Sequence, residues 1–263
     1  MTRRRTTVGR GRPWPRRGSV RPAEDPGALV VSGANAVLEL LRSGHPVTRL
    51  HLGTGAREAE VGAAARARNV PVAAAVPETL DQLAGSRHHQ GVVAVASPFR
   101  YVPLEILLGP ECRAALVLDG IQDPRNLGAI LRTARAAGVG GVVLPADRCV
   151  GVTSVVVSAA AGLLFGMPIA REPNLVRAME AMKGAGFWLV GLVARGGSPL
   201  FGFESPPRPA LVVGGEGEGL RSLVARTSDF SVSIPMAPGV ESLNVAVATG
   251  IALYEIVVRR ASI

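Results

Sequence analysis

The sequence predicts an α/β protein in which a large, mostly parallel sheet follows a smaller α/β unit. Apolar runs typical of buried strands alternate with helix-like patterns from about residue 28 onward, and this alternation builds parallel sheets with helices on both faces. The 263 residues are enough for two modest domains, each with its own core. Because hydrophobic residues make up 48% of the chain and aromatic residues 4%, we expect that core to consist of Ala, Val, Leu and Ile.

The first unit, residues 28–98, is predicted to begin with a strand and a helix. The apolar run at 28–33 is typical of a strand, and apolar residues then recur at helical spacing over 36–44 until a glycine ends the pattern. The remaining elements are predicted, in order, as a strand at 48–53, a helix at 60–69 and strands at 70–76 and 91–98. Residues 99–112 hold two prolines and no clear period, so we expect a linker there.

The second unit, residues 113–263, continues the alternation of strands and helices. Strands are predicted at 114–120, 139–145, 187–194 and 231–238, and a further strand runs into a glycine-rich turn over 210–220. Helices are predicted at 125–138, 153–164, 174–186 and 241–260. A parallel sheet of this kind binds its ligands at the carboxyl ends of its strands.

Most of the positive charge lies in an N-terminal tail. Residues 1–27 hold eight arginines against two acids, which gives +6 of the net charge of +9. Such a segment attracts phosphates whatever the base sequence, so we expect a disordered tail that contacts nucleic acid. The alternatives are a solvated leader without a partner and an organellar transit peptide, against which the prolines argue. The tail has no apolar stretch after its arginines and is therefore not a secretory signal.

Cysteine and histidine are too few for metal or disulfide chemistry. Cys112, Cys149 and four scattered histidines predict neither a zinc cluster nor a disulfide framework, so we expect a reduced, cytoplasmic setting and no metal site. The uncharged stretch 149–170 is long enough to cross a membrane. Its glycines, its hydroxyl groups and Pro168 instead favour a helix and loop buried within the protein, and we expect no membrane partner.

The turn after the strand at 114–120 carries the first candidate for chemistry. Asn126 is placed to cap the following helix, whose apolar residues recur at helical spacing. The residues predicted to lie off the buried face are Arg125, Gly128, Arg132 and Arg135. Arg132 gains nothing from the nearby positive end of the helix dipole, so it is better placed to meet an anion. The alternative is an ordinary solvated helix face.

The second candidate is the glycine-rich turn at 214–219. Its glycines do not follow the GxGxxG spacing, and Glu216 and Glu218 would sit where a pyrophosphate should be held, so the turn does not favour a nicotinamide dinucleotide. A cationic or sulfonium ligand tolerates these acids far better, and glycines let backbone approach a bound adenine closely. The alternative is a tight turn without a ligand.

The third candidate is the start of the last predicted helix, which is apolar almost all round. Glu241 or Ser242 can cap its amide groups, and Asn244 is predicted to be a neutral donor and acceptor in the first turn. Buried helices carry few polar residues, so polar residues at such a position suggest a function. The alternative is capping alone.

These three places resemble a known family. The segments DPRNLGAILRTARAAGV, LVVGGEGEGL and IPMAPGVESLNVAVATG are similar, in this order, to the three motifs of the SpoU (TrmH-type) RNA 2′-O-methyltransferases, a branch of the SPOUT superfamily. GANAVLELL and HHQGVVAV in the first unit resemble the L30e-like RNA-binding domain of that family. The likeness covers nearly the whole chain beyond the tail, and the arginine-rich tail departs from the family pattern.

The resemblance implies a SPOUT methyltransferase domain at 113–263 with a trefoil knot, preceded by an L30e-like RNA substrate-binding domain at 28–98, in a homodimer. It implies S-adenosyl-L-methionine as cofactor, held at Gly214, Ile234 and Leu243. The residues that match the active site of the family are Asn126, Arg132, Glu216, Ser242 and Asn244. The implied partner is RNA, with a guanosine ribose of large-subunit (23S) rRNA as target, and no DNA partner is expected. The alternatives are a tRNA-modifying or antibiotic-resistance relative and a non-catalytic RNA-binding assembly factor.

The implied reaction is an in-line displacement, so we expect geometry to dominate catalysis. Positioning contributes about 7 to 11 kcal/mol in well-oriented systems. The resemblance implies that Arg132 is the catalytic residue, and two roles for it stay open. It is described in the family as a base, but a guanidinium keeps its proton in proteins, so a charged Arg132 can instead stabilise the developing alkoxide or hold an adjacent phosphate.

Overall fold

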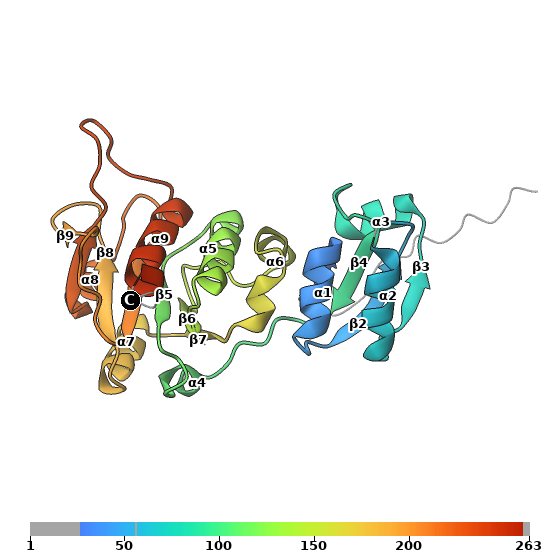
Figure 1. Ribbon diagram of the computed structural model, residues 1–263, viewed down its shortest axis with the longest axis horizontal. Helices are drawn as coiled ribbons and strands as arrows, with labels where there is room; N and C mark the ends of the chain where they lie inside the picture. The colour runs from blue at the N-terminus through green and yellow to red at the C-terminus, as the bar shows by residue number, and fades with distance from the viewer. Residues whose placement is uncertain (1–26, 56, 260–263) are drawn as a thin grey trace, which may run out of the picture.

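The structure, a computed structural model, describes residues 27–55 and 57–259 as two α/β domains that lie side by side (Figure 1). The smaller domain precedes the larger one in the chain. All but the last residue of the predicted arginine-rich tail lie outside the described residues. Among the described residues, no helix is long and apolar enough to cross a membrane.

The smaller domain is built on a mixed sheet with the strand order β1-β4-β2-β3. Its strands are β1 (Leu29–Ser32), β2 (Val47–Leu52), β3 (Val72–Ala74) and β4 (Val92–Ala96), and its helices are α1 (Ala34–Arg42), α2 (Glu58–Ala67) and α3 (Pro77–Ala84). Strand β4 pairs antiparallel with both β1 and β2, whereas β2 and β3 are parallel. Every predicted element of this unit is present. Helix α3 was not predicted, although Pro77 at its start and the left-handed Gly85 after its end are typical helix boundaries.

The larger domain contains, within the described residues, a seven-stranded sheet with the order β7-β6-β5-β10-β8-β11-β9. Its strands are β5 (Ala115–Asp119), β6 (Gly141–Pro145), β7 (Ile169–Glu172), β8 (Trp188–Leu192), β9 (Ser198–Pro199), β10 (Pro209–Gly214) and β11 (Phe230–Ser233). All of these strand pairs are parallel, so the predicted mostly parallel sheet is confirmed. The strand order reverses direction between β5 and β10, and such a switch point is where α/β sheets bind ligands. The trefoil knot stays a prediction.

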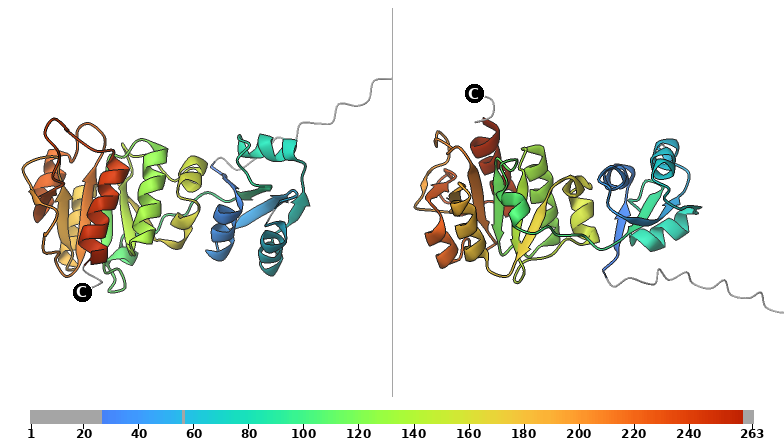
Figure 2. Two further views of the ribbon diagram at one scale, coloured as in Figure 1. Left: turned by 45° about the horizontal axis from the view of Figure 1, so that its top comes forward. Right: turned by 90° about the horizontal axis from the view of Figure 1, so that it is seen from below.

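Helices cover both faces of this sheet (Figure 2). One face carries α5 (Pro124–Ala136), α6 (Ser154–Ala159) and α9 (Val245–Leu253), and the other carries α4 (Glu105–Leu108), α7 (Leu175–Gly184) and α8 (Ser222–Thr227). Successive residues of β10 point to opposite faces, so Leu211 and Val213 join one core cluster while Ala210 and Val212 join the other. Both faces of the central strands are therefore apolar.

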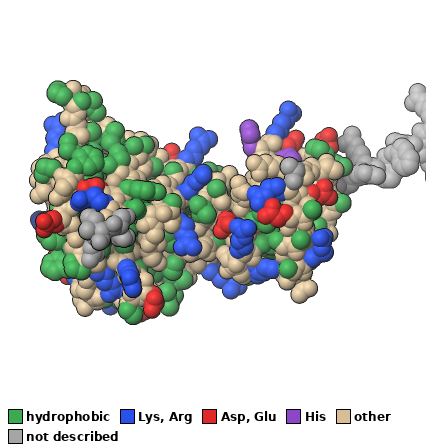
Figure 3. Space-filling model, in the orientation of Figure 1, with side chains coloured by type: hydrophobic (Ala, Val, Ile, Leu, Met, Phe, Trp, Pro, Cys, Tyr) green, Lys and Arg blue, Asp and Glu red, His purple; other side chains and the backbone are tan. Residues whose placement is uncertain are grey.

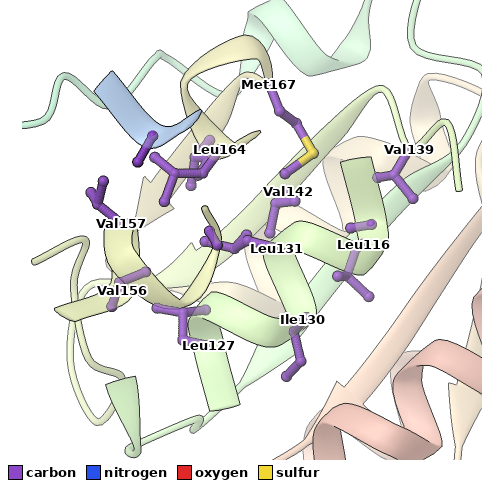
Figure 4. Packing of buried hydrophobic residues seen from close by; sticks show 14 of the residues in the cluster. Leu116, Leu127, Ile130, Leu131, Val139, Val142, Val156, Val157, Leu164 and Met167 are labelled. Atoms are coloured by element: carbon purple, nitrogen blue, oxygen red, sulfur yellow. The ribbon is translucent and has the colours of Figure 1, made fainter. Parts of the chain in front are cut away.

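Close packing of α5 on α6 depends on a glycine. Leu127 and Leu131 of α5 point toward the segment that holds Val156, Val157 and Leu164 (Figure 4). A Cβ atom on Gly128 would overlap that of Ala159 and would lie 2.7 Å from the carbonyl oxygen of Val156. The prediction that Gly128 lies off the buried face is therefore wrong, because the absence of a side chain lets the two helices meet there.

The predicted helix at 153–164 is broken into two pieces. Helix α6 ends at Ala159, and a 3-10 turn, η1 (Leu163–Gly166), follows two residues with positive φ, Ala161 at 50° and Gly162 at 79°. The smaller domain packs closely against this break, since a Cβ on Gly162 would lie 2.7 Å from the Cα of Ala36. The main-chain N–H of Val30 also donates a hydrogen bond to Ser154 Oγ at 2.8 Å, so the two domains are packed directly against each other.

The segment predicted to be a linker contacts the larger domain. Val102 forms a parallel bridge with Ala170 of β7, and α4 buries Leu107 in the core cluster beneath α7. Tyr101 accepts a hydrogen bond at its hydroxyl from the main-chain N–H of Val152 at 2.8 Å. The segment thus runs along the edge of the large sheet.

Candidate active site

A pocket of about 360 Å³ opens at the carboxyl ends of β8, β10 and β11, beside the start of α9. Its walls are made of the glycine-rich loop after β10, the segment after β11 and the first turn of α9. The lining residues include six of the eight predicted site residues, namely Gly214, Glu216, Ile234, Ser242, Leu243 and Asn244. A pocket of this size suits a small organic ligand. Three segments that are remote in the sequence therefore share one hollow.

The glycines of the loop are required by backbone contacts. A Cβ on Gly214 would overlap the carbonyl group of Gly219 and the main-chain nitrogen of Leu220, and one on Gly215 would overlap the carbonyl oxygen of Gly120. The loop closes on itself through a hydrogen bond from the N–H of Gly219 to the carbonyl oxygen of Gly215, at 3.2 Å. This close backbone packing presents main-chain atoms to the pocket where side chains would otherwise stand.

Asn126 connects two of the motifs through its side-chain amide. Its Nδ2 donates to Glu216 Oε1, and its Oδ1 accepts a hydrogen bond from Asn244 Nδ2 at 3.1 Å. The prediction that Asn126 caps its helix is wrong. Asp123 caps α5 instead, with its carboxylate accepting from the N–H of Arg125 at 2.7 Å, because Pro124 fits the first helical position. The amide of Asn126 is thereby available to the site.

Asn244 caps the start of α9 and also contacts Asn126. Its Oδ1 accepts from the N–H groups of Ala246 and Val247, at 2.9 and 3.3 Å, while its Nδ2 reaches Asn126. Asn244 is therefore the cap, and the prediction that Ser242 or Glu241 caps this helix, with Asn244 in the first turn, is wrong. The helix begins later than predicted, which leaves Ser242 and Glu241 in the loop that lines the pocket.

Arg132 lies apart from this cluster. It is exposed on α5, about two turns after the helix begins, and among the described residues it is not part of the pocket wall. Two nearby residues of α5 lie on different faces of the helix. Thr133 faces Gly250 of α9, and Arg135 faces Gly166 of η1. Arg132 therefore points outward between these faces and is free to meet a ligand from solution.

The two cysteines are not suited to act as nucleophiles. Burial raises the pKa of the Cys149 thiol to about 11, and burial also raises the pKa of Cys112. Both cysteines stay protonated near neutral pH and are therefore poor nucleophiles. The polar groups that the structure brings to the pocket are instead amides, carboxylates and a hydroxyl.

Sequence reasoning missed part of the pocket wall. The end of β8, residues 192–194, and Met236, Val245 and Ala248 also line the hollow. For residues 192–194 the position at the carboxyl end of a parallel strand beside β10 is the signal that could have identified them, whereas Val245 and Ala248 lie on α9. The strand order that makes β8 and β10 neighbours cannot be read from the alternation of elements.

Comparison with known proteins places both domains in families. The SpoU rRNA methylase family matches residues 113–254, and a domain described as RNA 2'-O ribose methyltransferase substrate binding matches residues 30–102. These matches define an RNA methyltransferase in which a substrate-binding domain precedes the methylase domain. The chain belongs to the SpoU rRNA methylase family, which confirms the resemblance of the three motifs.

Relatives support this assignment over almost the full chain. A putative TrmH family tRNA/rRNA methyltransferase of Staphylococcus aureus is 34% identical over 239 residues, which cover 88% of this chain and 96% of the relative. An AdoMet-bound rRNA methyltransferase from Sinorhizobium meliloti has a TM-score of 0.77 and 29% identity, with 90% of this chain and 88% of that chain covered. The SpoU methyltransferase AviRb from Streptomyces viridochromogenes, in complex with AdoMet, has a TM-score of 0.77 and 28% identity, with 90% and 92% covered.

Proposed function

We propose that this protein methylates the ribose 2′-OH of a guanosine in large-subunit (23S) rRNA, with S-adenosylmethionine (AdoMet) as methyl donor. The observation that carries the proposal is the hydrogen-bonded chain of Asn244, Asn126 and Glu216 at the rim of an apolar pocket. AdoMet is the cofactor of the solved relatives named above, and when bound it supplies a methyl group on a positively charged sulfur.

The residues of the pocket fit this cofactor. Ile234, Leu243 and Val213 offer apolar walls to an adenine ring, and the bare backbone at Gly214 allows close approach. The carboxylates of Glu216 and Glu241 line the same pocket, so a cation is favoured there over a pyrophosphate. We assign cofactor binding to Gly214, Ile234 and Leu243.

The polar residues at the rim would orient the ribose. The side chains of Asn126 and Asn244 are fixed by their mutual hydrogen bond, so their remaining donor and acceptor positions have defined directions. Glu216 holds the amide of Asn126, and Ser242 also lines the pocket. We assign the binding of the target nucleotide to these groups, and the stabilisation of charge on its 2′-oxygen to Arg132.

The smaller domain would bind the RNA beside this site. Lys and Arg side chains are spread over the middle of the molecule and the smaller domain in Figure 3, on the face that carries α5 and α1. Helix α5 carries three exposed arginines, Arg125, Arg132 and Arg135. Positive side chains along such a path attract the phosphates of RNA.

The experiment that tests the proposed function is mass-spectrometric mapping of ribose methylation in rRNA from cells with and without the gene. We expect one 2′-O-methylguanosine of 23S rRNA to be lost with the gene and restored by the wild-type chain. Loss of a tRNA methylation instead would identify a tRNA-modifying enzyme. Unchanged methylation of all RNA, in cells that express the protein, would favour a non-catalytic assembly factor.

We further propose that the protein is a homodimer that pairs through α9. This helix is apolar all round, yet Val247 is 52% exposed, and Tyr254, the first residue of the π-helical turn η2 (Tyr254–Val258) that continues the helix, is 50% exposed. Their spacing, with Ile251 between them, places them on one face of the helix. A continuous apolar stripe on a helix is typical of a surface that pairs with another chain.

Val247→Glu is expected to convert the dimer into a monomer, because a charge would be buried at the centre of the paired helices. The molar mass measured by light scattering during gel filtration should then fall from that of two chains to that of one chain. Val155→Glu is the matched control, since Val155 is 49% exposed on α6, away from α9, and should leave the mass unchanged. A wild-type chain that is monomeric at micromolar concentration would contradict the proposal.

A further inference from the structure

Asp119 at the end of β5 holds both ends of the glycine-rich loop 215–220. Its main-chain oxygen accepts a hydrogen bond from the N–H of Gly215 at 2.8 Å. Its carboxylate accepts from the N–H of Arg221 at 3.0 Å and pairs with the Arg221 guanidinium, with Nε at 2.7 Å and Nη2 at 2.6 Å. One residue thus fixes the point where the loop leaves β10 and the point where it enters α8.

The two members of this ion pair differ in how far they are buried. The side chain of Asp119 is 1% exposed, whereas that of Arg221 is 42% exposed. A buried carboxylate is costly to desolvate and rarely adds net stability, but it can select one conformation among several. The conformation selected here is that of a loop with four glycines between residues 214 and 219, which has high conformational freedom of its own.

The consequence concerns Glu216, which stands inside this loop. Glu216 accepts the hydrogen bond from Asn126 and lines the pocket, so its place depends on the backbone of the loop that carries it. The two ends held by Asp119 restrain that backbone, together with the hydrogen bond between Gly219 and Gly215 inside the loop. We propose that Asp119 is a positioning residue for methyl transfer, which acts through Arg221 and the loop to hold Glu216 and the backbone at Gly214 in place against the cofactor. This inference rests on the proposed function, in which the pocket binds AdoMet.

The test compares Asp119→Asn with Asp229→Asn in the full chain. Asp229 has the same chemistry in the same domain, because its carboxylate accepts from the N–H of Leu189 and pairs with Lys183 Nζ, both at 2.8 Å. Among the described residues, no hydrogen bond or ion pair joins it to the loop 215–220. In Asp119→Asn the new NH₂ group would face the guanidinium of Arg221, so two hydrogen-bond donors would meet. Arg221→Gln is the second variant, because it removes the same ion pair by a change at the exposed partner.

Hydrogen exchange without ligand and calorimetric titration with AdoMet are the two measurements. We expect Asp119→Asn and Arg221→Gln to exchange the amides of 215–221 faster than the wild type, to bind AdoMet at least tenfold more weakly and to lose about 100-fold in kcat. Asp229→Asn should change these values less than twofold. Addition of Arg221→Gln to Asp119→Asn should restore part of the binding, because an Asn–Gln pair can form a hydrogen bond.

Two results would overturn the inference while leaving the proposed function intact. One is that Asp119→Asn and Arg221→Gln both bind AdoMet with wild-type affinity and both protect the loop amides from hydrogen exchange as the wild type does. The other is an equal loss in Asp229→Asn, which would reduce the effect to general destabilisation. A wild-type chain that binds no AdoMet would overturn the proposed function, and the inference with it.

Discussion

Arg132→Ala is expected to lower kcat for RNA methylation by roughly 100- to 1000-fold, the range seen when a single group that stabilises a developing oxyanion is removed. The dissociation constant of AdoMet should change less than twofold, because Arg132 is exposed on α5 and is not among the described residues that line the pocket. Single-turnover methylation of an rRNA fragment and calorimetric titration with AdoMet give the two values separately.

Arg125→Ala is the matched control for this variant. Arg125 is exposed on the same helix, two turns before Arg132 and on the same face, and carries the same charge. We expect its loss to weaken RNA binding and leave kcat nearly unchanged. Arg132→Lys, which keeps the charge but loses the planar fork, should retain more activity than Arg132→Ala if the role is electrostatic. Equal loss of methylation and of AdoMet binding in Arg132→Ala would remove Arg132 from the chemistry.

The alternation of strands and helices could be predicted from the sequence because it depends on local periodicity. Strands such as β5 and β10 are continuous apolar runs, and α5 shows its buried stripe clearly. Helix starts were less predictable. The segment DPRN offers two capping side chains, Asp123 and Asn126, and only the fit of Pro124 to the first helical position decides between them.

The assembly of the site could not be predicted from spacing. Asn126 is 90 residues from Glu216 and 118 from Asn244, and their contacts follow from the strand order, which places the ends of β5 and β10 side by side. Their predicted grouping came from the family resemblance. The anchoring by Asp119 has no local signal either, since a buried Asp at a strand end resembles any turn residue until its partner, 102 residues away, is known.

Gly214→Ala is expected to abolish measurable AdoMet binding, at least a 100-fold loss. The added Cβ would overlap the carbonyl group of Gly219 and the nitrogen of Leu220, so the loop must move away from the pocket wall. Overpacking of this kind costs about 1 to 3 kcal/mol, so the melting temperature should also fall. Calorimetric titration with AdoMet and thermal unfolding measure the two effects.

Gly184→Ala separates the local effect from a general one. Gly184 is the last residue of α7, and an added Cβ there would meet nothing within 4 Å. This change should leave AdoMet binding intact and, because alanine is favoured over glycine in helices by up to about 1 kcal/mol, should not lower the melting temperature. If Gly214→Ala bound AdoMet with wild-type affinity, the cofactor would have to bind elsewhere, because a loop displaced at Gly219 cannot form the same wall of the pocket.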